Sequence, residues 1–439
     1  MRTIALSLFA LAALLPAQER ALCIKNARIV PVEGDPLENG MLLAQNGKIQ
    51  AIGKDLEIPA GALVVDARGG TLTPGLVSAF FRLGGGPRQP TQSPGGQRGR
   101  RGQMPQMPPP GDGGALANKA ATKVAPTIYV RQPVFGDLLA QGVTTLALAP
   151  SGAGFSGQAA LLDPAGKTLD TLVTADSAYQ LIAPQNNSRS KELAKTELDK
   201  AKKFLEDKSR PAPASQPSTQ AAPPPASQPV TAPSGAPTTA PAPAGQPPAQ
   251  PDKNVEALAE MLSGRQRAFV ELNSATDVSH FLDGLAGHRF PCVVVAARPS
   301  GNEGPLELAV AQLKELKAPV LLPPSLTTVP LTRDLVNPAA RLAAAGLEVG
   351  FLVGDSRDQV RSLFFRLTEL VRTGLTERQA LAGVTLVPAK MLGIEARKGS
   401  LKLGKDADVV LWSGDPFDPA SRLVKVWHAG IEVAKETKE

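Results

Sequence analysis

Short apolar runs separated by turn residues fill the chain from residue 22 to residue 66. These runs predict strands at 23–30, 41–44, 48–52 and 62–66. Asn46-Gly47 stands between two of the runs and is typical of a two-residue hairpin turn. This part of the chain is therefore predicted to be all β.

The pattern changes in the middle of the chain, where strand-like runs alternate with amphipathic helical stretches. Strands are predicted at 142–148, 268–272, 291–296, 319–322 and 347–353, and helices at 188–206, 253–263, 306–316 and 356–373. Thr376 and Gln379 have the spacing of a capping box and predict the start of a further helix. Such alternation indicates a parallel sheet or barrel.

Composition and charge exclude several classes of protein. The 439 residues carry 47 Lys and Arg against 40 Asp and Glu, and only 4% are aromatic. Without a clustered basic face or interleaved aromatics, no nucleic-acid partner is expected. Cys23 and Cys292 are the two cysteines, which excludes a disulfide scaffold and a zinc–thiolate site. Two unpaired, buried thiols are the expectation, with one long-range bridge as the alternative.

The first 17 residues are predicted to be a signal peptide. An apolar run from Ile4 to Leu15 follows Arg2 and is too short to span a membrane. Cleavage after Ala17 would produce an exported, soluble protein, periplasmic or extracellular, with no membrane span. The alternative for this run is a buried N-terminal helix.

Two segments have a composition that does not bury a core. Residues 85–115 are rich in Gly, Pro and Gln, and residues 208–252 are roughly a third proline. Both are predicted to be disordered insertions.

One stretch, residues 71–86, organises the interpretation of the whole chain. Its Pro74-Gly75-Leu76 turn resembles the turn before the first barrel strand of the amidohydrolase superfamily, in imidazolonepropionase-like members. In that family the strand ends in His-x-His, which directs two imidazoles into the barrel mouth. Here Phe80 and Arg82 occupy these positions. Phenylalanine has no lone pair to offer a metal, and arginine stays protonated.

Both ends of the chain carry further resemblance to this family. Similar stretches are 142–145, 387–394, 398–401, 404–412 and 414–416, and 424–433 looks like the family's last hairpin. The resemblance implies an α/β fold, a (β/α)8 TIM-like metallo-hydrolase barrel with a discontinuous composite β-sandwich. Residues 71–394 would form the barrel, and residues 18–70 plus 395–439 the sandwich.

The family's metal site uses four histidines, a Lys or Glu, and an Asp, and it would imply zinc or another divalent metal. The chain has three histidines, His280, His288 and His428, and none falls at a predicted strand end of the barrel mouth. Asn273 stands approximately where the family has one of them. No metal ligand and no cofactor are therefore predicted.

Asp355 is the one residue that fits the family's catalytic pattern. Gly354-Asp355-Ser356 resembles the strand-end Asp-Ser in which the Asp acts as general base on a metal-bound water. Asp355 is thus the candidate catalytic residue, and the competing interpretation makes it the N-cap of the 356–373 helix. Glu271, at the end of an earlier strand, is a second carboxylate that could face the mouth.

Three functions remain open at this point. The first is a catalytically degenerate homologue of metal-dependent C–N hydrolases, a pseudoenzyme that binds a ligand or a related active amidohydrolase subunit. The second is an active hydrolase of cyclic amides or peptide-like substrates with a carboxylate-based site that includes Asp355 and Glu271. The third is an exported scaffold. Family members commonly form oligomers, so a homo-oligomer is a further expectation. Metal analysis would separate the first two.

Overall fold

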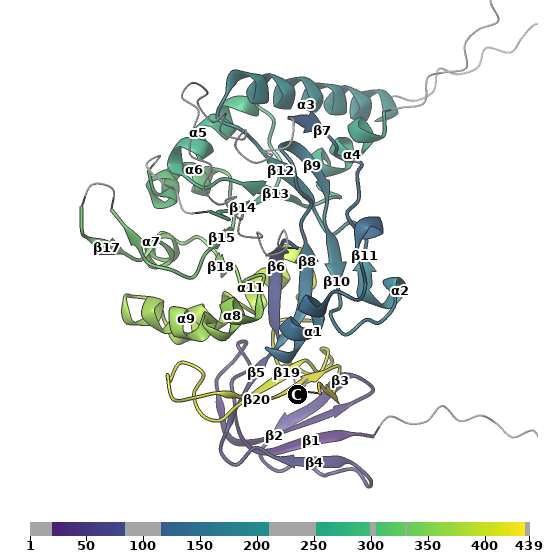
Figure 1. Cartoon of the computed structure of the whole chain (residues 1–439), viewed down its shortest axis with the longest axis vertical. Helices are drawn as coiled ribbons and strands as arrows, with labels where there is room; N and C mark the ends of the chain where they lie inside the picture. Colours follow the sequence, from purple (N-terminus) through teal and green to yellow (C-terminus); the bar gives the residue numbers. More distant parts are fainter. Residues whose placement is uncertain (1–19, 84–115, 210–251, 299–303, 330–331, 435–439) are drawn as a thin grey trace, which may run out of the picture.

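A computed structural model describes residues 20–83, 116–209, 252–298, 304–329 and 332–434 (Figure 1). The predicted signal peptide, the predicted insertion at 85–115 and most of the one at 208–252 lie outside these residues. At the edges of the second insertion, helix α3 continues through Ser209 and Asp252 caps helix α4. No helix in the described part of the chain is long and apolar enough to cross a membrane.

Strands from the two ends of the chain share one eight-stranded sheet, which lies at the bottom of Figure 1. Its order is β21-β20-β19-β5-β1-β2-β3, with β4 also paired to β1. The strands are β1 (Leu22–Ile29), β2 (Leu37–Gln45), β3 (Lys48–Gly53), β4 (Leu63–Asp66), β5 (Thr71–Pro74), β19 (Val409–Trp412), β20 (Leu423–His428) and β21 (Ile431–Glu432). Asn46 and Gly47 have φ values of 52° and 73°, so the predicted hairpin turn joins β2 to β3.

Seven of the described strands run parallel around a hydrophobic core that is separate from the core of the eight-stranded sheet. They are β6 (Leu76–Phe81), β8 (Val143–Leu148), β12 (Gln180–Ala183), β13 (Ala268–Glu271), β14 (Cys292–Val295), β15 (Val320–Leu322) and β18 (Val349–Phe351). β6 pairs with β8, and β12 to β18 form a continuous row. On one side, the Gly383 and Val384 carbonyls accept from the amides of Phe351 and Val77, so this segment joins β18 to β6.

Between β8 and β12, the structure differs from the predicted barrel of eight parallel strands. β9 (Gly154–Gln158) and β10 (Ala160–Leu162) form one crossing segment, in which β9 is antiparallel to β12 and β10 is antiparallel to β8. A Cβ at Gly157, where φ is 121°, would lie 2.5 Å from the Thr122 carbonyl oxygen. Only glycine fits this close approach, which explains why a glycine-rich run forms a strand here.

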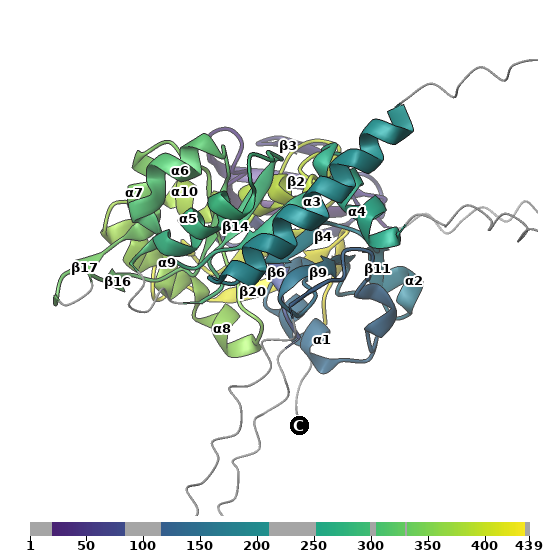
Figure 2. The same ribbon diagram turned by 90° about the horizontal axis from the view of Figure 1, so that it is seen from above.

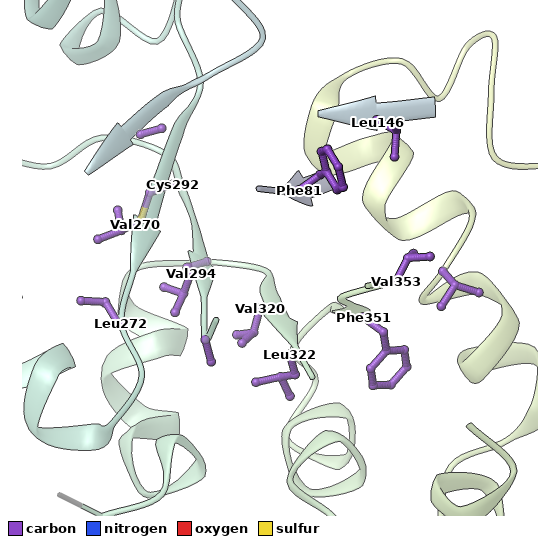
Figure 3. Close-up of a cluster of buried hydrophobic side chains, with 14 of the residues drawn as sticks. Phe81, Leu146, Val270, Leu272, Cys292, Val294, Val320, Leu322, Phe351 and Val353 are labelled. Atoms are coloured by element: carbon purple, nitrogen blue, oxygen red, sulfur yellow. The ribbon is translucent and has the colours of Figure 1, made fainter. Parts of the chain in front are cut away.

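Apolar residues on the parallel strands alternate between two clusters. The inner cluster holds Val77, Phe269, Val293 and Leu321, whereas Val270, Val294 and Val320 face outward toward the helices (Figure 3). The period of two is the strand's own side-chain period. Figure 3 labels the outward set of Phe81, Leu146, Val270, Leu272, Cys292, Val294, Val320, Leu322, Phe351 and Val353.

Helices cover the outside of the strands, and the long α3 crosses the top of the molecule (Figures 1 and 2). They are α1 (Pro133–Ala140), α2 (Leu169–Leu172), α3 (Ser188–Ser209), α4 (Lys253–Leu262), α5 (Ala275–Gly284), α6 (Val310–Glu315), α7 (Pro338–Ala344), α8 (Arg357–Arg361), α9 (Leu363–Arg372), α10 (Glu377–Ala382) and α11 (Leu386–Leu392), with 3-10 turns η1 (Ala125–Thr127) and η2 (Leu306–Ala309). The remaining short strands are β7 (Ala117–Asn118), β11 (Val173–Ala175), β16 (Thr327–Thr328) and β17 (Leu335–Val336).

Some of the predicted helix features are confirmed, whereas two predicted helices each consist of two separate elements. The capping box of Thr376 and Gln379 is present at the start of α10. The predicted helix 356–373 is two helices that meet at Ser362, and 306–316 is η2 followed by α6. Cys23 and Cys292 are both buried and free, as predicted. Burial raises the pKa of the Cys292 thiol to about 12, so this thiol is unreactive.

Candidate functional site

Strand β6 carries Arg82 to the mouth of the barrel. The pairing of β6 with β8 is irregular between Ser78 and Phe81. Phe80 belongs to the inner cluster, whereas Phe81 turns outward and contacts Phe135 of α1. Arg82 follows the last residue of the strand, and its guanidinium carbon lies 4.9 Å from the centroid of the Phe80 ring. The two residues at the His-x-His positions therefore form a cation–π contact.

Strand β13 supplies a carboxylate to the same place. Phe269 and Glu271 are two residues apart and share the inner face of the strand. Nη2 of Arg82 donates to Oε2 of Glu271 at 2.7 Å, and Nη2 of Arg298, beyond β14, lies 3.4 Å from Oε1. The Glu271 side chain is only 4% exposed, against 30% for Arg82 and 72% for Arg298.

This pairing is required by the burial of Glu271. A carboxylate removed from water is costly unless cations or donors replace its hydration. Arg82 does this with a short, charge-assisted hydrogen bond, the stronger class of such bonds. The Arg82–Glu271 pair is thus a built-in part of the barrel interior, with Arg298 as a more exposed second cation.

Tyr179 lies beside the pair and was not predicted from the sequence. It precedes β12 and stacks on Phe269, with ring centroids 3.8 Å apart and planes inclined by 13°. Tyr179 is fully buried, and its hydroxyl has no hydrogen-bond partner among the described residues. Burial raises the pKa of Tyr179, while the charges of Arg82 and Glu271 act on it in opposite directions. The site therefore contains a neutral phenol next to an ion pair.

The residues at the mouth do not fit the divalent metal that the family resemblance implies. Phe80 has no donor atom, and Arg82 places a permanent cation where a ligand would be needed. Both oxygens of Glu271 already face guanidinium groups. Within the described ranges, no group of three or more His, Cys, Asp and Glu residues could hold a metal ion.

Asp355 lies four residues after the last residue of β18, and its side chain is partly exposed. The competing interpretation of Asp355 as an N-cap is wrong, because Ser356 caps α8 by accepting a hydrogen bond from the Gln359 amide. The Asp355 amide itself donates to the Gln359 side chain at 3.0 Å. In the described part of the structure, no hydrogen bond or ion pair joins Asp355 to Glu271.

The three histidines lie away from the mouth. His280 belongs to α5, and His288 contacts Asp199 of α3 at 2.8 Å. His428, at the end of β20, lies 2.9 Å from Asp163 and 3.1 Å from Asp408. None of the three is therefore positioned to act at the barrel mouth.

His428 joins the composite sheet to the barrel half of the molecule. Burial alone would lower the pKa of His428, but hydrogen bonds and charges from Asp163 and Asp408 outweigh burial and raise it to about 9. Burial would likewise raise the pKa of Asp408, yet His428 and Lys398 hold it well below its usual range. The imidazolium is thus clamped between carboxylates of two different parts of the chain.

Comparison with known proteins connects these features to a family. The Amidohydrolase family profile matches residues 267–434. A 57-residue segment is 46% identical to amidohydrolase tasK of Hapsidospora irregularis and covers 13% of this chain and 6% of that protein. A 38-residue segment is 63% identical to imidazolonepropionase of Pseudomonas aeruginosa (strain UCBPP-PA14), covering 9% and 10% of the two chains. The matched segments thus span a tenth or less of these curated relatives.

Solved structures match over a much greater length. An amidohydrolase from Thermotoga maritima MSB8 superposes with a TM-score of 0.69 at 22% identity, covering 94% of this chain and all of that one. A Xaa-Pro dipeptidase with bound methionine gives a TM-score of 0.51 at 13% identity, with 94% and 99% covered. These likenesses establish the fold, an α/β TIM barrel with an added β-sandwich. By family profile, local identity and fold together, the chain is similar to proteins of the amidohydrolase superfamily, and one short segment is similar to imidazolonepropionase.

Proposed function

We propose that this chain is a catalytically degenerate amidohydrolase homologue, which acts by binding and does not hydrolyse carbon–nitrogen bonds. The observation that carries the proposal is the 2.7 Å ion pair between Arg82 and Glu271 at the barrel mouth. A zinc site needs neutral imidazoles or anionic ligands about 2.0–2.2 Å from the metal. A guanidinium that follows the first barrel strand repels such an ion and occupies the carboxylate that could have held it.

The alternative is a hydrolase built on Asp355 and Glu271. Two carboxylates that act together as acid and base must converge on one substrate or one water molecule. Glu271 instead directs its oxygens at Arg82 and Arg298, and no described contact links it to Asp355. The degenerate homologue is therefore the better-supported function, and the carboxylate-based hydrolase is an outcome that the experiment below would reveal.

The experiment is elemental analysis of the purified full-length chain, prepared without chelator, together with assays on cyclic amides and dipeptides. We expect no stoichiometric divalent metal and no hydrolysis. One equivalent of zinc, manganese or iron per chain, lost with activity in Asp355→Ala, would overturn the proposal. Asp358→Ala is the matched control, because Asp358 is an exposed carboxylate on the adjoining helix α8.

The binding role is proposed to be association with a related, active amidohydrolase or with a second copy of this chain. The support is indirect: the composite sheet remains intact although the mouth carries an ion pair. Such a chain retains the surface for assembly without the chemistry. An exported scaffold remains the third candidate, and export itself rests on the sequence of residues 1–17.

A further inference from the structure

A large cleft lies at the end of the barrel opposite the Arg82–Glu271 pair. Its volume is about 1120 Å³, and α1, α8, α9 and the 416–423 segment between β19 and β20 surround it. Leu76, the first residue of β6, lines the cleft, whereas Arg82 follows the last residue of that strand. Six residue steps along the strand, from Leu76 to Arg82, separate the two places by about 20 Å. The cleft is therefore distinct from the candidate site.

The floor of the cleft is aromatic and fixed in position. The rings of Phe364 and Trp412 meet edge to face with centroids 4.5 Å apart, and both side chains are mostly buried. Nε1 of Trp412 donates to the Thr73 hydroxyl at 3.0 Å, which sets the orientation of the indole. Leu139 adds aliphatic surface. An apolar group that enters the cleft thus meets a preformed surface, which reduces the ordering cost of binding.

The walls carry more positive than negative charge. Arg357 lies 3.9 Å from Asp137, so the charges of these two side chains largely offset each other. Asp418 accepts a hydrogen bond from the backbone amide of Ala420 in its own turn. No ion pair in the described ranges neutralises Lys167, Arg361 or Arg422, which also line the cleft. The charged lining residues are Lys167, Arg357, Arg361 and Arg422 against Asp137 and Asp418.

A polar atom inside the cleft also lacks a partner. The hydroxyl oxygen of Ser421 is buried and makes no hydrogen bond with any described residue. Arg422 is the next residue, and its backbone amide already donates to the Ser413 hydroxyl, which holds this turn in place. A buried hydroxyl without a partner is uncommon in a folded protein, and rotation of this side chain toward the cleft would let a ligand oxygen satisfy it.

We propose that this cleft binds a small amphiphilic organic anion, a carboxylate or sulfonate on an aromatic or acyl body. The body would lie on Phe364 and Trp412, and the anionic group would accept hydrogen bonds from Arg361, Arg422 and Ser421. Sites for small molecules combine an apolar lining with a few convergent polar groups, at volumes of about 300–1,000 Å³. The cleft, at about 1120 Å³, is slightly larger than this range, and it matches the description in its apolar lining and in its charged and polar lining residues.

The chain provides its own reporter for the test. Of its two tryptophans, Trp412 lines the cleft and Trp427 is fully buried in the composite sheet. Full-length Trp427→Phe protein would be titrated with decanoate, decyltrimethylammonium and decanol, with Trp412 emission as the signal. Calorimetric titration of the unaltered chain covers the case in which this variant does not fold. We expect saturable binding of decanoate that weakens with added salt and is absent for the cationic probe.

Charge reversal then assigns the site. Arg361→Glu with Arg422→Glu should weaken decanoate binding at least about tenfold, which corresponds to ~1.4 kcal/mol. Arg372→Glu is the matched control, because Arg372 is exposed on α9 but does not line the cleft. Equal binding of the three probes, or equal weakening in the control, would overturn the proposal. A dimer in sedimentation that the double variant abolishes would do so as well, because a second copy would then occupy the cleft.

Binding here is independent of the proposed loss of catalysis. Metal content and hydrolysis report on the mouth, whereas Trp412 emission reports on the cleft. A hydrolytically active protein that binds decanoate would refute the first proposal alone, and an inactive protein with no anion preference would refute the second alone.

Discussion

The protonation of His428 should make the stability of this protein depend on pH in the alkaline range. His428 lies between Asp163, which follows β10, and Asp408, which precedes β19. Its pKa is raised from 6.5 to about 9 in the folded chain. The folded state therefore holds a proton that the unfolded chain releases between these two values.

The sign and size follow from that difference. Stability falls with pH wherever the folded state binds more protons than the unfolded state. A shift from 6.5 to about 9 at ~1.36 kcal/mol per pH unit corresponds to ~3 kcal/mol. This contribution is fully present below pH 6.5 and is lost as pH rises through 9. Lys398 contacts Asp408 at 2.5 Å and Asp406 at 3.3 Å, so it remains to compensate part of the negative charge when His428 is neutral.

Urea unfolding between about pH 6 and pH 9.5, followed by circular dichroism, measures this dependence. The unaltered chain should lose ~3 kcal/mol of unfolding free energy over this range. His428→Gln should be less stable at pH 6 and nearly independent of pH. His288→Gln removes a histidine outside the network and is the matched control. A flat profile for the unaltered chain, or an undiminished fall in His428→Gln, would refute the reasoning.

Three further outcomes are expected. Arg82→Ala should destabilise the fold by ~3 kcal/mol because it leaves the buried Glu271 carboxylate without its close partner. Arg298→Ala removes an exposed partner and should cost less than ~1 kcal/mol. Equal losses of unfolding free energy in urea would contradict this assignment. Thr376→Ala should lower the stability of the protein by ~1 kcal/mol because it removes the capping oxygen of α10, whereas Thr376→Ser keeps that oxygen and should change stability very little. Calorimetric melting measures both variants, and equal effects would argue against the cap. Co-expression with a related active amidohydrolase should produce one peak in size-exclusion chromatography, and separate elution at micromolar concentration would count against the proposed partnership.

The features that could be predicted from the sequence are those that depend on residues close together along the chain. The Asn46-Gly47 turn and the Thr376–Gln379 capping box each depend on a few adjacent positions, and both form as expected. The division of 356–373 at Ser362 was not visible, because the apolar period continues through it. Asp355 and Ser356 are both competent caps, and in the structure it is the Ser356 side chain that accepts the capping hydrogen bond from the Gln359 amide.

The candidate site was predictable only in part, because its members come from distant strands. The sequence itself places Phe80 and Arg82 at the positions that resemble His-x-His, but the Arg82–Glu271 contact joins residues 189 positions apart and depends on the register of two strands. Tyr179 had no signal in spacing or motif. The glycine-rich segment at Gly157 carries no strand pattern in the sequence, and it forms a strand by pairing with β12.

The composite sheet has a consequence for how the chain folds during synthesis. β5 pairs with β1 on one side and with β19 on the other, and Thr73 and Trp412, which join β5 to β19, are 339 positions apart. Until the ribosome has delivered β19, β5 therefore presents an unpaired edge with apolar residues such as Leu72. Open edges of this kind recruit strands from other chains. The chain is therefore expected to be exposed to aggregation until β19 is available to pair with β5 and close the sheet.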